Sequence, residues 1–313
     1  MALAFVFPGQ GSQSLGMMNG FADDASVRQT FEEASGVLGQ DLWAMCADGA
    51  DAAVINATVN TQPLMLTASV AIFRAWRAAG GAAPAIAAGH SLGEYSALAA
   101  AGSIAFADAV KLVRLRAEAM QSAVPEGEGA MAAILGLPDD VIVAACLEAA
   151  QGEVVEAVNF NSPGQVVIAG SKAAVERAMA LCKDKGAKRA LPLPVSVPSH
   201  CALMKPAAER LAVALAQVHV AAPEFPVIHN ADVAAYTDPA QIRDALVRQL
   251  YQPVRWVESV QKVAADGGAT VFAECGPGKV LSGLNKRIAD GAQHTALGDV
   301  AAFDALKALL KPD

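Results

Sequence analysis

The sequence lacks several features that would place a protein in a membrane or outside the cell. No uninterrupted apolar run reaches the ~18 residues that a membrane-spanning helix needs. The apolar run Met1–Phe7 carries no basic residue and ends at Pro8 and Gly9, so we expect a first strand there and no signal peptide. The 313 residues contain no internal repeat, low-complexity tract or flexible linker. We therefore expect a cytoplasmic protein without membrane association, built as one large domain with at most one smaller one.

Paired cysteines and an excess of positive charge are also missing. The five cysteines form no Cys-x-x-Cys pair, and their spacing with histidine does not repeat as in a metal site. We expect reduced thiols and no bound metal. With 31 acidic and 23 basic residues, the formal net charge is −8. This balance argues against a nucleic-acid partner, and an acidic partner would have to contact a local basic patch.

The sequence does contain an alternation of short apolar runs and helical segments. Strands are predicted at Ala2–Phe7, Ala85–Ala88 and Thr270–Ala273, and helices at Pro63–Ala79 and Ala107–Ala123. This alternation is typical of a mostly parallel sheet covered by helices. We therefore expect an α/β protein.

The middle of the chain has a different pattern, which predicts a small subdomain at residues 126–196. Its elements follow the order β-α-β-β-α-β, which is the ferredoxin-like order. Strands are expected at 130–135, 154–160, 165–169 and 188–193, helices at 139–150 and 172–184, and a turn at 161–164. Residues 1–125 and 197–313 then form the larger core, and a cleft between the two parts is the expected ligand site.

The pentapeptide Gly-His-Ser-Leu-Gly at Gly89–Gly93 is the most informative motif. A short apolar strand precedes it and a good helix-forming segment, Glu94–Ala101, follows it, as in a nucleophile elbow. The flanking glycines allow a sharp turn and a close approach of another chain, which exposes the hydroxyl of Ser91 at a helix N-terminus. The motif could also occur by chance in a chain rich in glycine and alanine. As an elbow, it predicts that Ser91 accepts an acyl group.

A serine nucleophile needs a base, and His200 is favoured among the five histidines. His90 adjoins Ser91 and would point elsewhere at a sharp turn, and three others have no supporting neighbours: His219, His229 and His294. His200 follows Pro198 in a loop at the exit from the predicted subdomain, a placement typical of catalytic groups. The alternative is a neutral histidine that only stabilises this loop.

Two glycine-rich segments have competing interpretations. The segment Gly9–Gly11 follows a strand as in a dinucleotide-binding loop, but Ser14 stands where the third glycine would be. The segment Gly276–Lys279 is similar to part of a phosphate-binding loop, but Ala273 replaces its first glycine and Val280 its hydroxyl residue. A tight turn that leads into a helix is therefore favoured for the second segment, and no cofactor is expected.

Four motifs, taken together and in this order, carry a resemblance to a known family. They are Phe7–Gln13, Gly89–Tyr95, Pro198–His200 and Glu274–Leu281. From the first strand to about Ile288, the sequence resembles the malonyl-CoA:acyl carrier protein transacylases of bacterial fatty-acid synthesis. The resemblance implies an α/β-hydrolase-like core with an inserted ferredoxin-like subdomain. It also implies transfer of a malonyl group from malonyl-CoA to the phosphopantetheine thiol of acyl carrier protein, through a malonyl-serine intermediate.

The resemblance implies roles for individual residues. Ser91 would be the nucleophile and His200 its base, oriented by the backbone carbonyl of Gln249 in place of a carboxylate. The backbone N–H groups of Leu92 and Gln10 would bind the oxyanion of the tetrahedral intermediate. An acid behind the histidine is therefore not expected.

The resemblance also implies a cation for the malonyl carboxylate. Arg116 matches this position, and its planar guanidinium suits a carboxylate. The alternative is a solvated helix charge, as expected for Lys111 and Arg114, and Ala117 follows Arg116 where the family often has glycine. Three further residues match family positions near the cleft: Gln62, Asn161 and Ser199.

The carrier proteins of this family are acidic, so docking is expected on basic residues around the cleft. The candidates are Lys183, Lys185, Lys188, Arg189, Lys286 and Arg287. We expect a monomer. Three other functions stay open: a serine thioesterase or esterase with the same elbow, an acyltransferase that serves a polyketide synthase, and a non-catalytic module that binds carrier protein. A thioesterase would usually have an acid in its triad and no buried arginine for a dicarboxylic acyl group.

Overall fold

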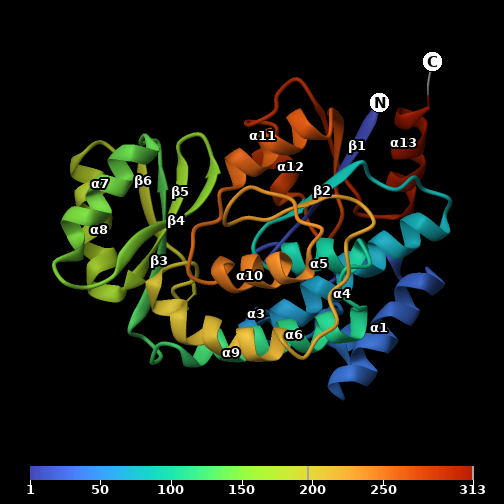
Figure 1. The fold of residues 1–313 in the computed structure, drawn as a ribbon, viewed down its shortest axis with the longest axis horizontal. Helices are drawn as coiled ribbons and strands as arrows, with labels where there is room; N and C mark the ends of the chain where they lie inside the picture. The colour runs from blue at the N-terminus through green and yellow to red at the C-terminus, as the bar shows by residue number, and fades with distance from the viewer. Residues whose placement is uncertain (196, 312–313) are drawn as a thin grey trace.

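The computed structural model, which describes residues 1–195 and 197–311, contains two separate β-sheets (Figure 1). The larger sheet has five parallel strands in the order β7-β2-β1-β8-β9. The strands are β1 Ala2–Phe7, β2 Ile86–Gly89, β7 Val227–Ile228, β8 Ala269–Glu274 and β9 Gln293–Ala296. The predicted parallel sheet is confirmed, and β1, β2 and β8 lie within one residue of their predicted ends.

Helices surround the larger sheet (Figure 1). The helices outside the smaller sheet are α1 Ala25–Leu38, α2 Leu42–Cys46, α3 Ala52–Asn56, α4 Thr58–Ala78, α5 Gly93–Ala100, α6 Phe106–Ser122, α9 Lys205–Leu215, α10 Pro239–Gln249, α11 Trp256–Asp266, α12 Val280–Asn285 and α13 Val300–Leu310, with short 3-10 turns at Asn19–Phe21 and Ala202–Met204.

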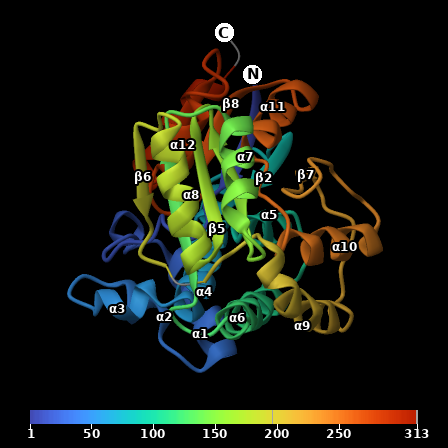
Figure 2. The same ribbon diagram turned by 90° about the vertical axis from the view of Figure 1, so that its left-hand side faces the viewer.

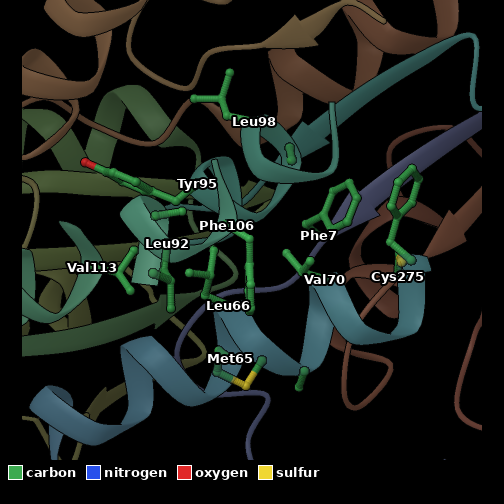
Figure 3. Packing of buried hydrophobic residues seen from close by; sticks show 14 of the residues in the cluster. Phe7, Met65, Leu66, Val70, Leu92, Tyr95, Leu98, Phe106, Val113 and Cys275 are labelled. Atoms are coloured by element: carbon green, nitrogen blue, oxygen red, sulfur yellow. The ribbon is translucent and has the colours of Figure 1, made fainter. Parts of the chain in front are cut away.

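Strand β1 is central because its alternate side chains are buried on both faces of the sheet. Phe5 and Phe7 belong to the core that contains the buried side chains of α4 and α6, part of which Figure 3 shows with Phe7 labelled. Ala4 and Val6 point to the opposite core, which contains the buried side chains of α11 and α12. Burial on both faces explains the continuous apolar run of this strand. The parallel pairing places the loops after β1 and β2 at the same edge of the sheet.

The smaller sheet lies beside the larger one and is antiparallel throughout (Figure 1 and Figure 2). Its order is β4-β5-β3-β6. Helices α7 and α8 pack on one face, and the other face buries Cys201, the residue after His200. The elements are β3 Gly129–Leu135, α7 Asp139–Ala150, β4 Val155–Ser162, β5 Gln165–Ser171, α8 Lys172–Asp184 and β6 Arg189–Pro192, in the predicted β-α-β-β-α-β order.

The predicted boundaries of the small subdomain stay a prediction. The expected final residue, 196, lies outside the described residues. The predicted turn at residues 161–164 is two residues too long, because Asn161 and Ser162 still belong to β4 and only Pro163 and Gly164 form the turn. Asn161 therefore sits at the end of a strand, where its side-chain direction is set by the sheet.

Helix α4 begins five residues earlier than the sequence predicts, and Pro63 lies inside it. Proline has no N–H, so it cannot bond the carbonyl of Val59 one turn earlier. The Nη1 atom of Arg114 donates to this carbonyl instead, at 3.0 Å. The expectation that Arg114 is a solvated helix charge is therefore wrong, because the guanidinium caps a carbonyl that the proline leaves free. Lys111, in contrast, is 65% exposed, as expected.

Within the described part of the chain, we find no helix with both the length and the apolar character that a bilayer crossing requires.

Candidate active site

The elbow predicted at Gly89–Gly93 connects the end of β2 to the start of α5. Ser91 has a φ of 51°, in the left-handed region that non-glycine residues rarely adopt. The two glycines are required by contact: a Cβ at Gly89 would lie 1.9 Å from the carbonyl carbon of Gly93, and one at Gly93 would lie 2.0 Å from the carbonyl oxygen of Phe7. The turn can form only where both side chains are absent.

His200 is the histidine that reaches the serine. Its Nε2 atom lies 2.7 Å from Ser91 Oγ, and its Nδ1 atom lies 2.7 Å from the carbonyl oxygen of Gln249. Because a carbonyl only accepts, Nδ1 carries the proton of the neutral ring, and Nε2 is left to accept from the serine hydroxyl. His200 also has a positive φ, 65°, and its backbone N–H donates to the carbonyl of Leu250 at 3.0 Å.

The imidazole of His200 is neutral over the physiological pH range. Burial in the protein, and then the nearby charge of Arg116, together lower the pKa of His200 from its ordinary value to about 3. The carbonyl of Gln249 opposes this shift by accepting from the ring. A neutral ring is the form that can accept a proton from a serine hydroxyl.

Arg116 lies on α6 with 1% of its surface exposed, so it is not a solvated helix charge. Its Nη1 donates to Gln62 Oε1 at 2.7 Å, and its Nη2 donates to Gln249 Oε1 at 3.1 Å and to Ser91 Oγ at 3.2 Å. Burial lowers the pKa of the guanidinium, which still keeps its charge because the pKa of a free arginine is so high. The structure thus places a buried cation in direct contact with the serine oxygen.

The two predicted oxyanion donors lie on loops that touch. The loop after β1 passes so close to the elbow that a Cβ at Gly9 would lie 2.5 Å from the carbonyl oxygen of His90 and 3.7 Å from the backbone nitrogen of Leu92. Neither the N–H of Leu92 nor that of Gln10 donates a hydrogen bond to another residue that the structure describes. The side chain of Gln10 is held separately, because its Oε1 accepts from Thr58 Oγ1 at 2.9 Å.

The three remaining predicted residues differ in how closely they join this group. Gln62 is buried and contacts Arg116 directly. Asn161 Oδ1 accepts from His90 Nε2 at 2.8 Å, so the elbow is joined to strand β4 of the smaller sheet. The hydroxyl of Ser199 donates to the carbonyl of Val197 at 3.4 Å, and among the described residues it makes no hydrogen bond to the serine, the histidine or the arginine.

A second layer of buried polar groups was missed by the sequence reasoning. Asn230, two residues after β7, accepts from the backbone N–H of Ser91 at 2.7 Å through Oδ1. Glu94 is fully buried and contacts His229, Asn230 and Gln249. His229 has a companion after all, and the expectation that no neighbour supports it was wrong. The available indication was Glu94 itself, since it is the one charged residue of α5.

The segment Gly276–Lys279 is a tight turn into α12, as predicted. Gly276 and Gly278 have φ of 157° and 78°, and the helix begins at Val280. The carboxylate of Glu274 accepts from the backbone N–H groups of Leu281 and Ser282 at 3.1 and 2.7 Å. Two of the helix N-terminal donors that a phosphate would use are therefore already bonded by the protein.

Comparisons with known proteins agree with this arrangement. Residues 4–304 match the family model of the acyl transferase domain. A malonyl CoA-acyl carrier protein transacylase of Salmonella typhimurium is 61% identical over 303 residues, which cover 96% of this chain and 97% of that protein. The chain therefore belongs to the acyl transferase family. Within this family, it belongs to the malonyl CoA-acyl carrier protein transacylases.

Solved structures show the same fold. An acyl carrier protein S-malonyltransferase from Vibrio cholerae is 60% identical and superposes with a TM-score of 0.95, covering 98% of this chain and 100% of that one. A malonyl-transacylase whose structure contains its type II PKS acyl-carrier protein is 55% identical, with a TM-score of 0.95 over 97% of this chain and 98% of that one.

Proposed function

We propose that this protein transfers a malonyl group from malonyl-CoA to the phosphopantetheine thiol of acyl carrier protein, through a malonyl ester of Ser91. One observation supports this proposal above the others. A single serine oxygen contacts a neutral histidine at 2.7 Å and a buried guanidinium at 3.2 Å. The first contact suits acyl transfer, and the second suits an acyl group that ends in a carboxylate.

The first half-reaction loads the serine. Ser91 Oγ attacks the thioester carbonyl carbon while His200 Nε2 takes the hydroxyl proton. The backbone N–H groups of Leu92 and Gln10 bind the oxyanion that forms, and removal of one such donor typically costs ~10²–10³-fold in rate. When the intermediate collapses, the carbon–sulfur bond breaks and the imidazolium of His200 returns the proton to the thiolate of coenzyme A.

The second half-reaction repeats these steps with another thiol. The phosphopantetheine thiol of the carrier gives its proton to His200 and attacks the malonyl ester, and the ester oxygen leaves as the hydroxyl of Ser91 once His200 reprotonates it. The carbonyl of Gln249 keeps the proton of the neutral ring on Nδ1 in both halves. No carboxylate contacts the ring of His200 among the described residues, so the carbonyl acts alone there.

Arg116 explains the preference for malonyl. An isolated carboxylate would be costly to bury, and the guanidinium is the buried cation that the described site offers. Gln62 and Gln249 hold its Nη1 and Nη2 atoms in fixed positions, so the cation cannot move away to solvent. A neutral acyl group would leave this buried cation without a carboxylate in direct contact and is expected to bind less well.

We also propose the finer classification of the fold as an α/β-hydrolase-like core, residues 1–125 and 197–313, with a ferredoxin-like subdomain inserted at 126–196. The support for the core is the elbow between a parallel strand and a helix. The support for the subdomain is its antiparallel β4-β5-β3-β6 sheet with both helices on one face.

The carrier is expected to dock on basic residues around the cleft of a monomer. Lys185 already pairs with Glu148 at 3.2 Å, whereas Lys286 and Arg287 are exposed just after α12, and α12 contacts strand β4. We therefore favour Lys286 and Arg287 as carrier contacts. A related malonyl-transacylase has been solved in complex with its own acyl-carrier protein, which supports a carrier as the partner.

Incubation with malonyl-CoA, with and without carrier protein loaded with phosphopantetheine, tests the proposed function. A transacylase converts the carrier to its malonyl form and releases coenzyme A in equal amount. Rapid hydrolysis that added carrier does not divert would show a thioesterase instead. Absence of any adduct on Ser91 would favour the alternative of a non-catalytic module that binds carrier protein.

A further inference from the structure

Glu94 is a fully buried acidic residue that the proposed mechanism does not use. It lies on α5, three residues after Ser91, and none of its surface is exposed. Its Oε1 accepts from His229 Nδ1 at 2.6 Å, and its Oε2 accepts from the backbone N–H of Asn230 and from Gln249 Nε2, both at 2.9 Å. Burying a carboxylate is costly unless such donors surround it, and here three donors converge on it.

Two of these donors also hold the nucleophile. The Oδ1 of Asn230 accepts from the backbone N–H of Ser91 at 2.7 Å, and its Nδ2 donates to the carbonyl of Gly89 at 2.7 Å. The Nε2 of Gln249 donates to the carbonyl of Ser91 at 2.8 Å. The backbone N–H and C=O of the serine are therefore both bonded to side chains of residues that Glu94 bonds in turn.

The serine needs this support because its backbone conformation is unfavourable. A non-glycine residue at positive φ costs of the order of 1–3 kcal/mol and persists only where the surroundings hold it. Ser91 has a φ of 51°, and it is flanked by Asn230 on the N–H side and by Gln249 on the carbonyl side. Released from these contacts, the serine would lose the geometry that aims its hydroxyl at the histidine.

Gln249 also connects Glu94 to the base and to the cation. Its backbone carbonyl accepts from His200 Nδ1 at 2.7 Å, and its Oε1 accepts from Arg116 Nη2 at 3.1 Å. One glutamine side chain thus contacts Glu94, Ser91 and Arg116 while its main chain orients His200. A hydrogen bond from Glu94 to this side chain fixes all of these contacts together.

The loop that supplies Asn230 is itself tightly constrained. The N–H of His229 donates to the carbonyl of Ala234 at 2.9 Å, and the N–H of Val233 donates to the carbonyl of His229 at 3.1 Å. Val233 has a φ of 56°, which is exceptional for a β-branched residue. Such a conformation is kept where the fold needs an exact backbone position, and here that position presents Asn230 to Glu94 and to the elbow.

We propose that Glu94 is a positioning residue for acyl transfer, whose buried carboxylate fixes Ser91 through Asn230 and Gln249 and fixes Gln249 against His200 and Arg116. In many acyl-transfer triads a carboxylate contacts the histidine directly. Here the carboxylate of Glu94 acts on His200 indirectly, through the side chain of Gln249. This inference rests on the proposed function, because positioning is defined by the reaction of Ser91.

A double-mutant cycle between Glu94→Gln and Gln249→Met tests the proposal. Glu94→Gln keeps the size of the side chain but replaces an accepting oxygen with an NH₂ group. Gln249→Met keeps the backbone carbonyl that orients His200 and removes only the side-chain contacts. Gln249→Met removes the hydrogen bond to Glu94, and Glu94→Gln weakens the same bond by taking the charge from its acceptor, so each single variant is expected to lower kcat ~10–100-fold, as for lost hydrogen bonds to a charged group. The double variant is expected to lose little more than the worse single variant.

Two readouts separate positioning from general stability. The first is the second-order rate at which a small fluorophosphonate modifies Ser91, which should fall with kcat in both single variants. In Glu94→Gln, which keeps the contact between Gln249 and Arg116, the KM for malonyl-CoA should change less than ~3-fold. The second is a comparison with the variant Glu274→Gln. This change removes another fully buried glutamate, whose carboxylate caps α12 and does not contact the site. Glu274→Gln should be destabilised and still react normally per folded molecule.

The outcomes distinguish this inference from the proposed function. If the unaltered protein forms no malonyl adduct, the proposed function fails. If it does form the adduct, but losses in the two single variants multiply in the double variant, or Glu94→Gln keeps full reactivity, the inference about Glu94 fails alone. Should Glu94→Gln not fold, the same cycle with Glu94→Asp applies, since the shorter side chain keeps the charge but cannot reach both Asn230 and Gln249 at 2.9 Å.

Discussion

The Nη2 atom of Arg116 lies 3.2 Å from Ser91 Oγ, so the buried cation contacts the nucleophile itself. In the proposed function, substrate selection and catalysis are therefore adjacent in this site. A carboxylate bound by Arg116 would lie close to the serine that attacks the other end of the same short acyl chain.

Arg116 should decide which acyl group is transferred. In Arg116→Ala, the malonyl carboxylate loses its counter-charge, and we expect kcat/KM for malonyl transfer to fall by ~10²-fold or more, since charge-assisted bidentate pairs are among the strongest. Transfer of a neutral acetyl group should be spared or improved. Steady-state rates with malonyl-CoA and acetyl-CoA measure the ratio.

Arg114→Ala is the matched control for this change. Arg114 lies on the same helix but caps the carbonyl of Val59. Arg114→Ala should lower the transfer rates of malonyl and acetyl by the same factor, through a loss of stability. Equal losses for malonyl and acetyl in Arg116→Ala would refute the role assigned to Arg116.

The charge of Arg116 should also be visible in the titration of His200. The guanidinium is the second cause, after burial, that lowers the pKa of His200 to about 3. In Arg116→Met, a side chain of similar length without charge, we expect the pKa of His200 to rise. NMR of the protein with labelled histidine, across pH 3–8, follows the ring directly. A pKa of His200 that does not change in Arg116→Met would contradict this effect of the Arg116 charge.

Burial of His200 should make the fold less stable in mild acid. The unfolded chain binds a proton on this ring below about pH 6.5, whereas the folded protein binds one only near pH 3. Between these values the unfolded state holds more protons, so the free energy of unfolding falls as the pH drops, by up to ~1.4 kcal/mol per pH unit. Urea titrations at pH 7, 6 and 5 should show a smaller loss for His200→Gln than for the unaltered protein. A loss of the same size would mean that His200 does not cause it.

Gly93 should tolerate no side chain. A Cβ at this position would lie 2.0 Å from the carbonyl oxygen of Phe7, which is backbone and cannot move aside. We expect Gly93→Ala to lower the free energy of unfolding by ~2–3 kcal/mol or more, as overpacking does, and to misplace Ser91. Gly36→Ala is the control, because no atom of the described residues lies within 4 Å of a Cβ at this position on α1, and it should stabilise the helix by ~1 kcal/mol. A Gly93→Ala protein of normal stability and activity would contradict the elbow packing.

The sequence predicted the residues that belong to motifs and missed those that act through tertiary contacts. Ser91 lies in a pattern whose glycines have a local steric reason, so strand, turn and helix could be placed to within one residue. Asn230 lies 139 positions after Ser91 in the sequence. Its side chain can accept from the backbone N–H of Ser91 only because β7 pairs with β2. No local periodicity encodes that pairing, because β7 contains only two residues.

The start of helix α4 is a second feature that depends on a tertiary contact and could not be predicted from the local sequence. Pro63 is a good local reason to start a helix, and the sequence-based prediction begins there. The structure starts at Thr58 because Arg114, from α6, supplies the hydrogen bond that the proline cannot. The compensating hydrogen bond comes from a residue 51 positions after Pro63, so a rule based on neighbouring residues cannot predict it.

Mass spectrometry of the protein after brief mixing with malonyl-CoA tests the central claim most directly. The predicted result is a malonyl ester located on the peptide that contains Ser91, lost when carrier protein bearing a free phosphopantetheine thiol is added, with malonyl-carrier as the product. An ester found on another residue, or an adduct that water discharges as fast as the carrier does, would contradict transfer between two thiols through Ser91.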